Sequence, residues 1–259
     1  MNSLARQCYE KDFQEVCILS EDASKGWSEL SMQAPTLPRG WFELSRLSPE
    51  ERIEFTRDFW FSFLPYHPLV HPILSEFFSR LDDIALVLAK KDEEFCPELV
   101  YSLADNSTFF RGLPPASEED LRELRLEIDQ SLPRDYLAFL KIHNGFGKLS
   151  EIGMLRIEDV GMARQRAKEL LLNPEKSVTS QGHPVDPGSL IPFYEAYGLV
   201  SFQCFYADWY PGSEMGNVYL SGIDYTISDI RDRKNWGDNG AFATFMEWLI
   251  HYLEGMTFG

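Results

Sequence analysis

The order of helical and extended segments constrains the fold of this 259-residue chain more than any other feature of its sequence. A capping box at 117–120 and the Leu132-Pro133 pair each predict the start of a helix. An amphipathic pattern with apolar positions between Phe242 and Leu253 predicts a closing helix. Between them lie runs rich in β-branched and aromatic residues, at 190–194, 199–206 and 217–221. This order predicts an α+β domain whose antiparallel or mixed sheet is flanked by helices.

The sequence before residue 115 has a different pattern, in which prolines separate helical segments. The Ser-Pro-Glu-Glu helix start at 48–51 predicts a helix to about residue 61. Apolar residues spaced three or four apart predict a second helix over 72–90, and a shorter helix is predicted after Pro97.

Segment 105–116 contains Gly112 followed by Pro114 and Pro115, which is typical of a linker. We therefore expect a helical N-terminal region of unknown role at 1–114 and an α+β domain at 115–259.

Aromatic residues are dense in the N-terminal region, and two interpretations of them are open. They form either the core of that region or a groove for a peptide or helix of another protein, and the core is the favoured interpretation. The residues are Trp41, Phe42, Phe55, Phe59, Trp60, Phe61 and Phe63.

The chain is strongly acidic, with 24 Lys+Arg against 41 Asp+Glu and a formal net charge of −17. This balance disfavours nucleic acid as a partner, because phosphate binding needs clustered basic side chains. It favours a basic protein partner instead. No apolar run is long enough for a transmembrane helix, and the polar start lacks the pattern of a secretory signal, so we expect a cytoplasmic protein with no membrane partner.

The residues that carry metal or covalent chemistry are scattered. The four cysteines contain no CxxC pair, and prolines interrupt the helix that would bring His67 and His71 onto one face. Residues 145–148 lack the first glycine and the Ser or Thr of a phosphate loop, and no nucleophile elbow is present. We expect no metal, no cofactor and no enzymatic activity; a hydrolase built from scattered residues is the less favoured alternative.

The most informative local feature is a segment from Ser177 to Ile230 that contains no Lys or Arg but many acidic and aromatic residues. Its loop at 208–214 is the best candidate for exposed aromatic side chains, because large rings in a loop have less core to fill. The alternative is a sheet core with a solvated edge, since strand alternation turns about half of the side chains inward. The candidate protein-binding residues are Glu195, Asp208, Trp209, Tyr210, Glu214 and Asp224.

The motif Leu132-Pro133-x-Asp135-Tyr136-x-x-Phe139-Leu140-x-x-x-Asn144-Gly145 resembles the opening signature of the Smi/Knr-like family of the SUKH superfamily. Four weaker landmarks follow in the family's order over roughly residues 115–256, at 190–193, 202–206, 216–219 and 242–249. Two departures are the turn at 195–198, which keeps a single glycine, and Gln130-Ser131, which replaces the family's small residue.

This resemblance implies a binding module without catalytic residues. Proteins of the family are immunity proteins that neutralise bacterial toxins or, in fungi, a scaffold that coordinates cell-wall synthesis and signalling. We therefore expect an immunity-type protein that neutralises a basic toxin, with a regulatory scaffold of several weak partners as the alternative. The sequence leaves the oligomeric state open.

Overall fold

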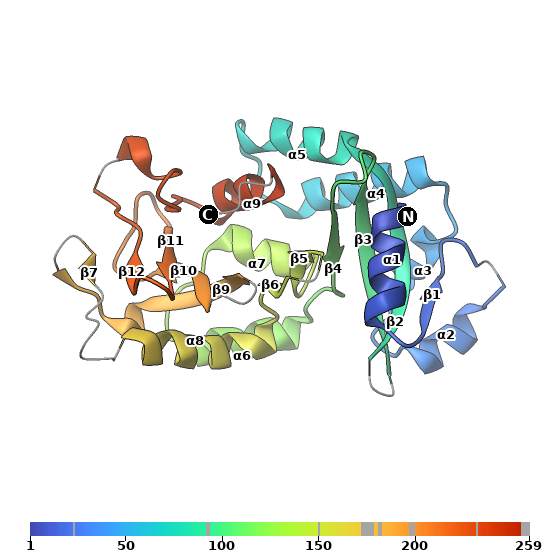
Figure 1. The fold of residues 1–259 in the computed structure, drawn as a ribbon, viewed down its shortest axis with the longest axis horizontal. Helices are drawn as coiled ribbons and strands as arrows, with labels where there is room; N and C mark the ends of the chain where they lie inside the picture. Colours follow the sequence, from blue (N-terminus) through green and yellow to red (C-terminus); the bar gives the residue numbers. More distant parts are fainter. Residues whose placement is uncertain are drawn as a thin grey trace. The chain divides into compact units, whose positions relative to one another are not determined.

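The computed structural model divides the chain into two compact units (Figure 1). The first unit is Met1–Pro115 with Ile142–Leu149, and the second is Ala116–Lys141 with Ser150–Gly259. Both contain helices and antiparallel strands, which confirms the predicted α+β class. The structure describes residues 1–22, 24–91, 94–149, 151–171, 179–180, 183–196, 200–231 and 233–254.

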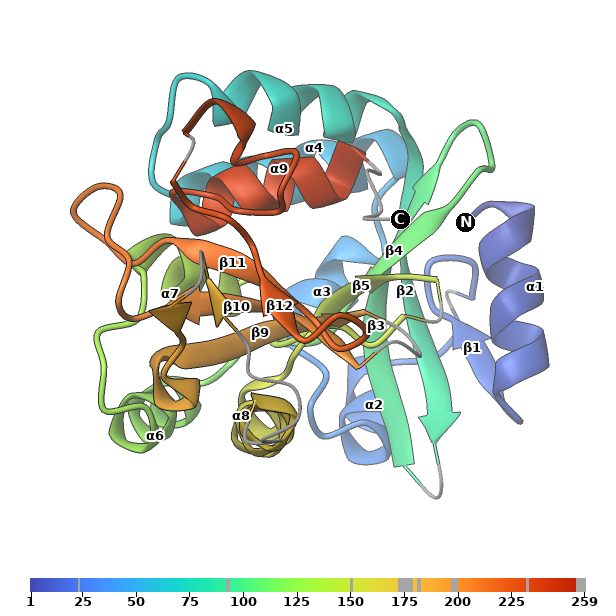
Figure 2. The same ribbon diagram turned by 60° about the vertical axis from the view of Figure 1, so that its left-hand side comes forward.

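The first unit is built on antiparallel strands in the order β1-β2-β3-β4-β5. Figure 2 shows β2 and β3 as its two long strands, with α1 beside them. The elements are α1 (Ser3–Asp12), β1 (Val16–Ile18), α2 (Trp27–Gln33), α3 (Arg39–Leu44), α4 (Pro49–Phe63), α5 (Val70–Ser79), β2 (Leu81–Lys91), β3 (Glu94–Leu103), β4 (Phe109–Gly112) and β5 (Phe146–Lys148).

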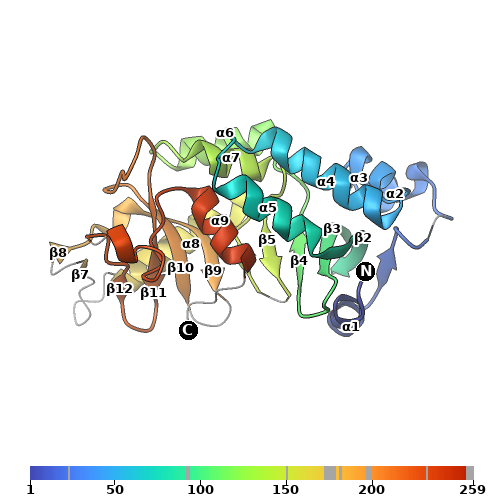
Figure 3. The ribbon, with the colours of Figure 1, turned by 90° about the horizontal axis from the view of Figure 1, so that it is seen from above.

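Helices cover both faces of this sheet. On one face, Ala5 and Tyr9 of α1 pack against Val100 and Phe109. The next residue of β3, Tyr101, points to the other face, because successive side chains of a strand alternate. There its ring lies 5.8 Å from that of Trp60 on α4. Helices α4 and α5 run side by side on this second face (Figure 3).

The short segment Ile142–Leu149 completes the first unit although it lies far from it in sequence. Its strand β5 pairs with β4, where Gly112 is opposite Phe146. Leu113 N donates to Gly145 O at 3.0 Å, and Gly145 takes a positive φ of 108° that favours glycine. The Asn-Gly end of the helix before it therefore turns the chain into a strand.

His143 lies at the centre of the aromatic packing in this unit. The Tyr101 hydroxyl lies 2.6 Å from His143 Nε2 and accepts from Trp60 Nε1 at 3.2 Å. His143 Nδ1 lies 2.8 Å from the Leu113 carbonyl oxygen, so Nδ1 carries the proton and Nε2 accepts from the tyrosine. Burial lowers the pKa of His143 to about 4, which leaves the imidazole neutral at neutral pH.

Four predictions for the N-terminal region meet different outcomes. The helix starting at Ser48 is confirmed, with both hydrogen bonds of its capping box. The helix predicted over 72–90 is wrong beyond Ser79, because β2 begins at Leu81. The same apolar spacing fits a strand covered on both faces, as residues 83–89 are all buried. The helix predicted after Pro97 is strand β3, and the predicted linker contains β4.

The second unit places its antiparallel strands in the order β6-β9-β10-β11-β12. Figure 1 shows α6 and α8 side by side along β9. The elements are α6 (Glu118–Glu127), α7 (Arg134–Leu140), β6 (Gly153–Met154), α8 (Ile157–Leu171), β7 (Thr179–Ser180), β8 (His183–Pro184), η1 (Pro187–Ser189), β9 (Leu190–Ala196), β10 (Ser201–Tyr206), β11 (Asn217–Ser221), β12 (Thr226–Ile227), η2 (Arg233–Asn235) and α9 (Phe245–Glu254). The predicted turn at Tyr197-Gly198 lies outside the described residues.

Rings from α7, α9 and the sheet form the core of this unit. The Phe193 ring lies 4.3 Å from that of Phe205, and Trp248 of α9 meets it edge-on at 4.8 Å. Tyr136 of α7 lies 5.4 Å from Phe245. The signature residues Tyr136, Phe139 and Leu140 are all buried in this core.

A β-bulge determines which face of the sheet each side chain of β9 occupies. Gln203 pairs with Tyr194 and Cys204 with Pro192, so Phe193 is the extra residue. Phe193 and Tyr194 therefore both reach Trp248. The following residue, Glu195, points instead toward α8.

Asp135 of the signature connects α7 to α9. Its carboxylate accepts hydrogen bonds from the backbone N–H of Tyr136 at 2.9 Å and of Met246 at 3.0 Å. Burial nevertheless raises its pKa to about 6, because desolvation of the carboxylate outweighs the two hydrogen bonds.

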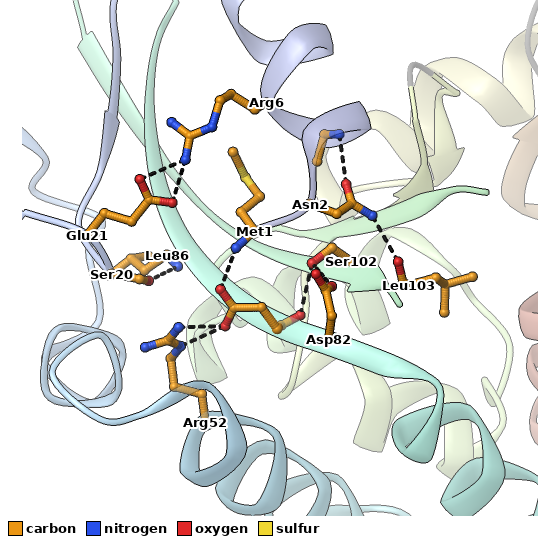
Figure 4. Close-up of polar contacts among 12 residues, drawn as sticks. Met1, Asn2, Arg6, Ser20, Glu21, Arg52, Asp82, Leu86, Ser102 and Leu103 are labelled. Carbon is orange, nitrogen blue, oxygen red and sulfur yellow. Dashed lines mark hydrogen bonds and ion pairs between the residues drawn. The ribbon is translucent and has the colours of Figure 1, made fainter. Parts of the chain in front are cut away.

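A buried carboxylate connects three elements of the first unit. Arg52 of α4 donates from Nε and Nη2 to Oδ1 of Asp83 at 2.9 and 2.6 Å, and the Met1 amino group donates to Oδ2 at 2.6 Å. Figure 4 labels Arg52 and Met1, and dashed lines mark their contacts. Because all three groups are buried, Arg52 depends on Asp83 for charge compensation, and the carboxylate is compensated by Arg52 and the Met1 ammonium together.

We predict that Arg52→Met lowers the free energy of unfolding by about 3 kcal/mol, since it removes one of the two cations that compensate the buried carboxylate and leaves the Met1 ammonium as the other. Arg57→Met on the same helix is the matched control: Arg57 pairs with Asp58 at the surface, so its loss should cost less than about 1 kcal/mol. Chemical denaturation of the three proteins measures both changes. Equal, small effects would contradict the assigned role of Asp83.

Gly112→Ala should destabilise the first unit by about 1–3 kcal/mol, because a Cβ at this strand position would overlap the enclosed His143 ring. Gly212→Ala is the control, since a Cβ there meets no atom within 4 Å. Thermal unfolding of both variants compares them. If Gly112→Ala has the same melting temperature as the native chain, His143 does not fill this space.

Candidate interaction surface

The bulge of β9 places the buried carboxylate of Glu195 against Arg166, whose own side chain is partly exposed. The two carboxylate oxygens of Glu195 accept from Arg166 Nη1 and Nη2 of α8 at 2.8 and 2.6 Å. The same guanidinium lies over the Phe202 ring, 5.6 Å from its centroid. Both Glu195 oxygens thus serve a contact within the unit, and the residue is not part of an exposed acidic surface.

Trp209 is the buried centre of the loop between β10 and β11. Only 8% of it is exposed, so the expectation that its ring lies at the surface is wrong. The ring meets Trp236 edge-on at 5.0 Å, and Gly216 packs so closely that a Cβ there would lie 2.5 Å from it. Gly216 N donates to Trp209 O at 3.0 Å, which closes the loop around the ring.

Tyr210, directly after this tryptophan, points the other way and is 53% exposed. Asp208 on the other side of Trp209 is also exposed. The buried ring therefore anchors a loop that presents the two flanking side chains to solvent.

Glu214 ends the same loop and caps helix α7. Its Oε2 accepts from the backbone N–H of Arg134, the first residue of α7, at 2.8 Å, and its Oε1 lies 3.3 Å from Arg134 Nε. The Pro133 N-cap offers no side-chain hydrogen bond, so Glu214 supplies what the helix start lacks.

Asp224 lies apart from this loop, in the turn between β11 and β12. Its backbone N–H donates to Ser221 Oγ at 3.1 Å, and the next residue, Tyr225, has a φ of 58°. The side chain of Asp224 is exposed.

Arginines from other parts of the second unit neutralise part of the acidic segment. Glu195 pairs with Arg166, Glu214 with Arg134, and Asp229 with Arg231. The absence of basic residues from Ser177 to Ile230 in sequence thus does not produce an equally acidic surface.

A smaller group of residues remains accessible to solvent, which we call the acidic–tyrosine patch: the exposed Asp186, Asp208 and Tyr210 with the half-buried Tyr206. Ala207 N donates to Ser189 O at 2.8 Å, which holds the end of β10 beside η1 and its cap Asp186. Burial and the nearby carboxylates of Asp208 and Asp186 raise the pKa of Tyr206. Asp186 and Tyr206 were missing from the predicted set, although both lie in the segment that lacks basic residues; their proximity to Asp208 requires the fold.

The histidines and cysteines do not converge on a metal centre in the described part of the chain, where no three His, Cys, Asp or Glu side chains could hold an ion. His67 and His71 instead pack locally, with His71 Nδ1 3.2 Å from the His67 backbone oxygen. Cys204 is buried in β10, and burial raises the pKa of its thiol. Among the described residues, no helix combines the length and apolarity needed to cross a bilayer.

Comparison with known proteins relates the sequence to one family. The model of the SMI1/KNR4 family (SUKH-1) matches residues 115–250, more than half of the chain. No curated protein matches the chain. The matched range begins just before α6 and ends within α9, and it contains the signature helix α7 and strands β9, β10 and β11 in the expected order. This chain therefore belongs to the SMI1/KNR4 family, SUKH-1.

Proposed function

We propose that this chain is a cytoplasmic, non-enzymatic protein of the immunity type, whose second unit binds a basic protein toxin through the acidic–tyrosine patch. Family membership supports a protein-interaction or immunity-type module. The scattered thiols in the sequence suit a reducing compartment. We also propose residues 115–259 as the SUKH-like domain, which follows an N-terminal region at 1–114.

The observation that carries this proposal is the exposed ring of Tyr210 on an anchored loop that also exposes Asp208. A tyrosine offers a large contact area with few rotatable bonds, which is why it is enriched among residues that dominate binding energy. Trp209 holds the loop in place before binding, so less conformational entropy is lost on association. Asp208 and Asp186 add a negative field that accelerates encounter with a basic surface.

A regulatory scaffold is the second candidate, and the compact first unit favours it. A separate unit with its own core can carry a second binding function. A scaffold should bind several proteins weakly, through surfaces on both units, whereas an immunity protein should bind one partner tightly through the second unit.

We predict that Tyr210→Ala weakens the complex with the cognate partner by about 2 kcal/mol, roughly thirtyfold in Kd. Affinity capture with the full-length chain at low and high salt first identifies the partner, and calorimetry then measures Kd. Tyr66→Ala is the control, because Tyr66 is 78% exposed but lies in the first unit. Equal affinities of the two variants would exclude the acidic–tyrosine patch.

Asp208→Asn tests the electrostatic part of the proposal separately. Association should slow and become less dependent on salt, while dissociation should change little, since a charge at the rim of an interface acts mainly on encounter. Stopped-flow measurements at two ionic strengths give both rates. A salt dependence equal to that of the native chain would contradict a role of Asp208 in steering.

A further inference from the structure

The first unit contains an apolar pocket of about 280 Å³ that the proposed protein-binding surface does not use. It lies between α3, α4 and strand β3, and every residue that lines it belongs to the first unit. Its walls include the rings of Trp41, Phe55, Phe59 and Trp60. The sequence allowed two interpretations of these aromatics, a core or a groove, and the structure divides them between the two.

The exposed fraction of these rings increases from the base of the pocket to its mouth. Trp60 is fully buried at the base, and Trp41 is nearly so, whereas Phe55 is 60% exposed and Phe59 is also partly exposed. Phe55 and Phe59 are four residues apart on α4, so their side chains lie on one face of the helix. Two phenylalanines at the mouth of a ring-lined pocket place more apolar surface in water than packing of the helix requires.

The polar groups at the base of the pocket already make hydrogen bonds within the protein, with the exception of one hydroxyl. Tyr101 and His143 also line the pocket, and they belong to the hydrogen-bond chain that runs from Trp60 Nε1 to the Leu113 carbonyl. In the part of the chain that the structure describes, the buried Oγ1 of Thr56 has no hydrogen-bond partner. A buried hydroxyl without a hydrogen bond lowers the free energy of unfolding by about 1–3 kcal/mol.

Thr56 can turn this hydroxyl toward the pocket. The residue lines the pocket and is 5% exposed, and since Oγ1 is inaccessible, the exposed part belongs to its other atoms. Threonine adopts two χ1 rotamers in helices, and a rotation of about 120° can bring the hydroxyl to the position that the methyl group held, while the methyl group takes the place of Hβ. Because Oγ1 makes no hydrogen bond where it lies, this rotation breaks none.

We propose that this pocket binds a small, neutral aromatic molecule of one or two rings that carries a hydroxyl or amino group, which Thr56 Oγ1 meets by a hydrogen bond. The ring walls favour an aromatic ligand, because ring pairs gain from edge-to-face and offset contacts. The volume suits one or two rings, since a cavity of about 150 Å³ accommodates benzene. A charged ligand is disfavoured, because no charged side chain lines the pocket to replace its lost hydration.

Titration of the full-length chain with 4-methylphenol and with 1,4-dimethylbenzene tests the proposal, because the two molecules match in shape and differ in one hydroxyl. Without a partner in the pocket, the phenol would bind more weakly, since its hydroxyl must leave water. We expect the native chain to bind 4-methylphenol at least fivefold more tightly, as measured by calorimetry. Binding of neither molecule, or tighter binding of the hydrocarbon, would overturn the proposal.

Two variants of Thr56 isolate the hydroxyl. Thr56→Val keeps the shape and should reverse the preference in favour of 1,4-dimethylbenzene, without loss of thermal stability. Thr56→Ser keeps the hydroxyl and should retain the preference for the phenol. A Thr56→Val variant that still prefers 4-methylphenol would overturn the role of this residue.

Gly40→Leu tests the location. Gly40 lines the pocket, and a Cβ at this position meets no atom within 4 Å, so the larger side chain has room. We expect at least a tenfold loss of binding for both molecules with an unchanged melting temperature, while Tyr210→Ala in the second unit binds them as the native chain does. Native affinity in Gly40→Leu would show that the ligands bind elsewhere and would overturn the assignment.

Discussion

The pairing of β5 with β4 is the contact on which the first unit depends, and a single missing side chain makes it possible. Gly112 in β4 leaves the space that the His143 ring occupies, and the ring then joins Tyr101 and Trp60 in one hydrogen-bond chain. The segment Ile142–Leu149 belongs to the family-matched range and yet packs in the first unit. The N-terminal half therefore depends for its core on residues at the end of the family signature and directly after it.

Local signals carried most of the information that the sequence provided. The capping boxes at Ser48 and Ser117 located two helices, and the Leu-Pro signature located α7. The helix predicted over 72–90 failed because β2 is buried on both faces, and a continuous apolar run fits either period. The orientation of Trp209 was not predictable either, because it depends on Gly216 and Trp236, which only the fold brings together.

The surface charge of the second unit was likewise not predictable from the sequence alone. A segment without lysine or arginine suggested a continuous acidic face, but Arg134 and Arg166 reach it from helices that precede it in sequence. Charge counted along the chain and charge at a surface are thus different quantities. The net charge of −17 remains, so the long-range field stays negative, while only the acidic side chains outside these pairs are available to select a partner.

The bulge at Phe193 determines which face of the sheet each later residue of β9 occupies. Every side chain after it lies on the face opposite to the one that a regular strand would give it, and this is how Glu195 meets Arg166. A regular strand with the same number of residues would turn the carboxylate into the aromatic layer beneath α9 and away from Arg166. The position of the bulge along β9 therefore selects which residue of the strand faces α8.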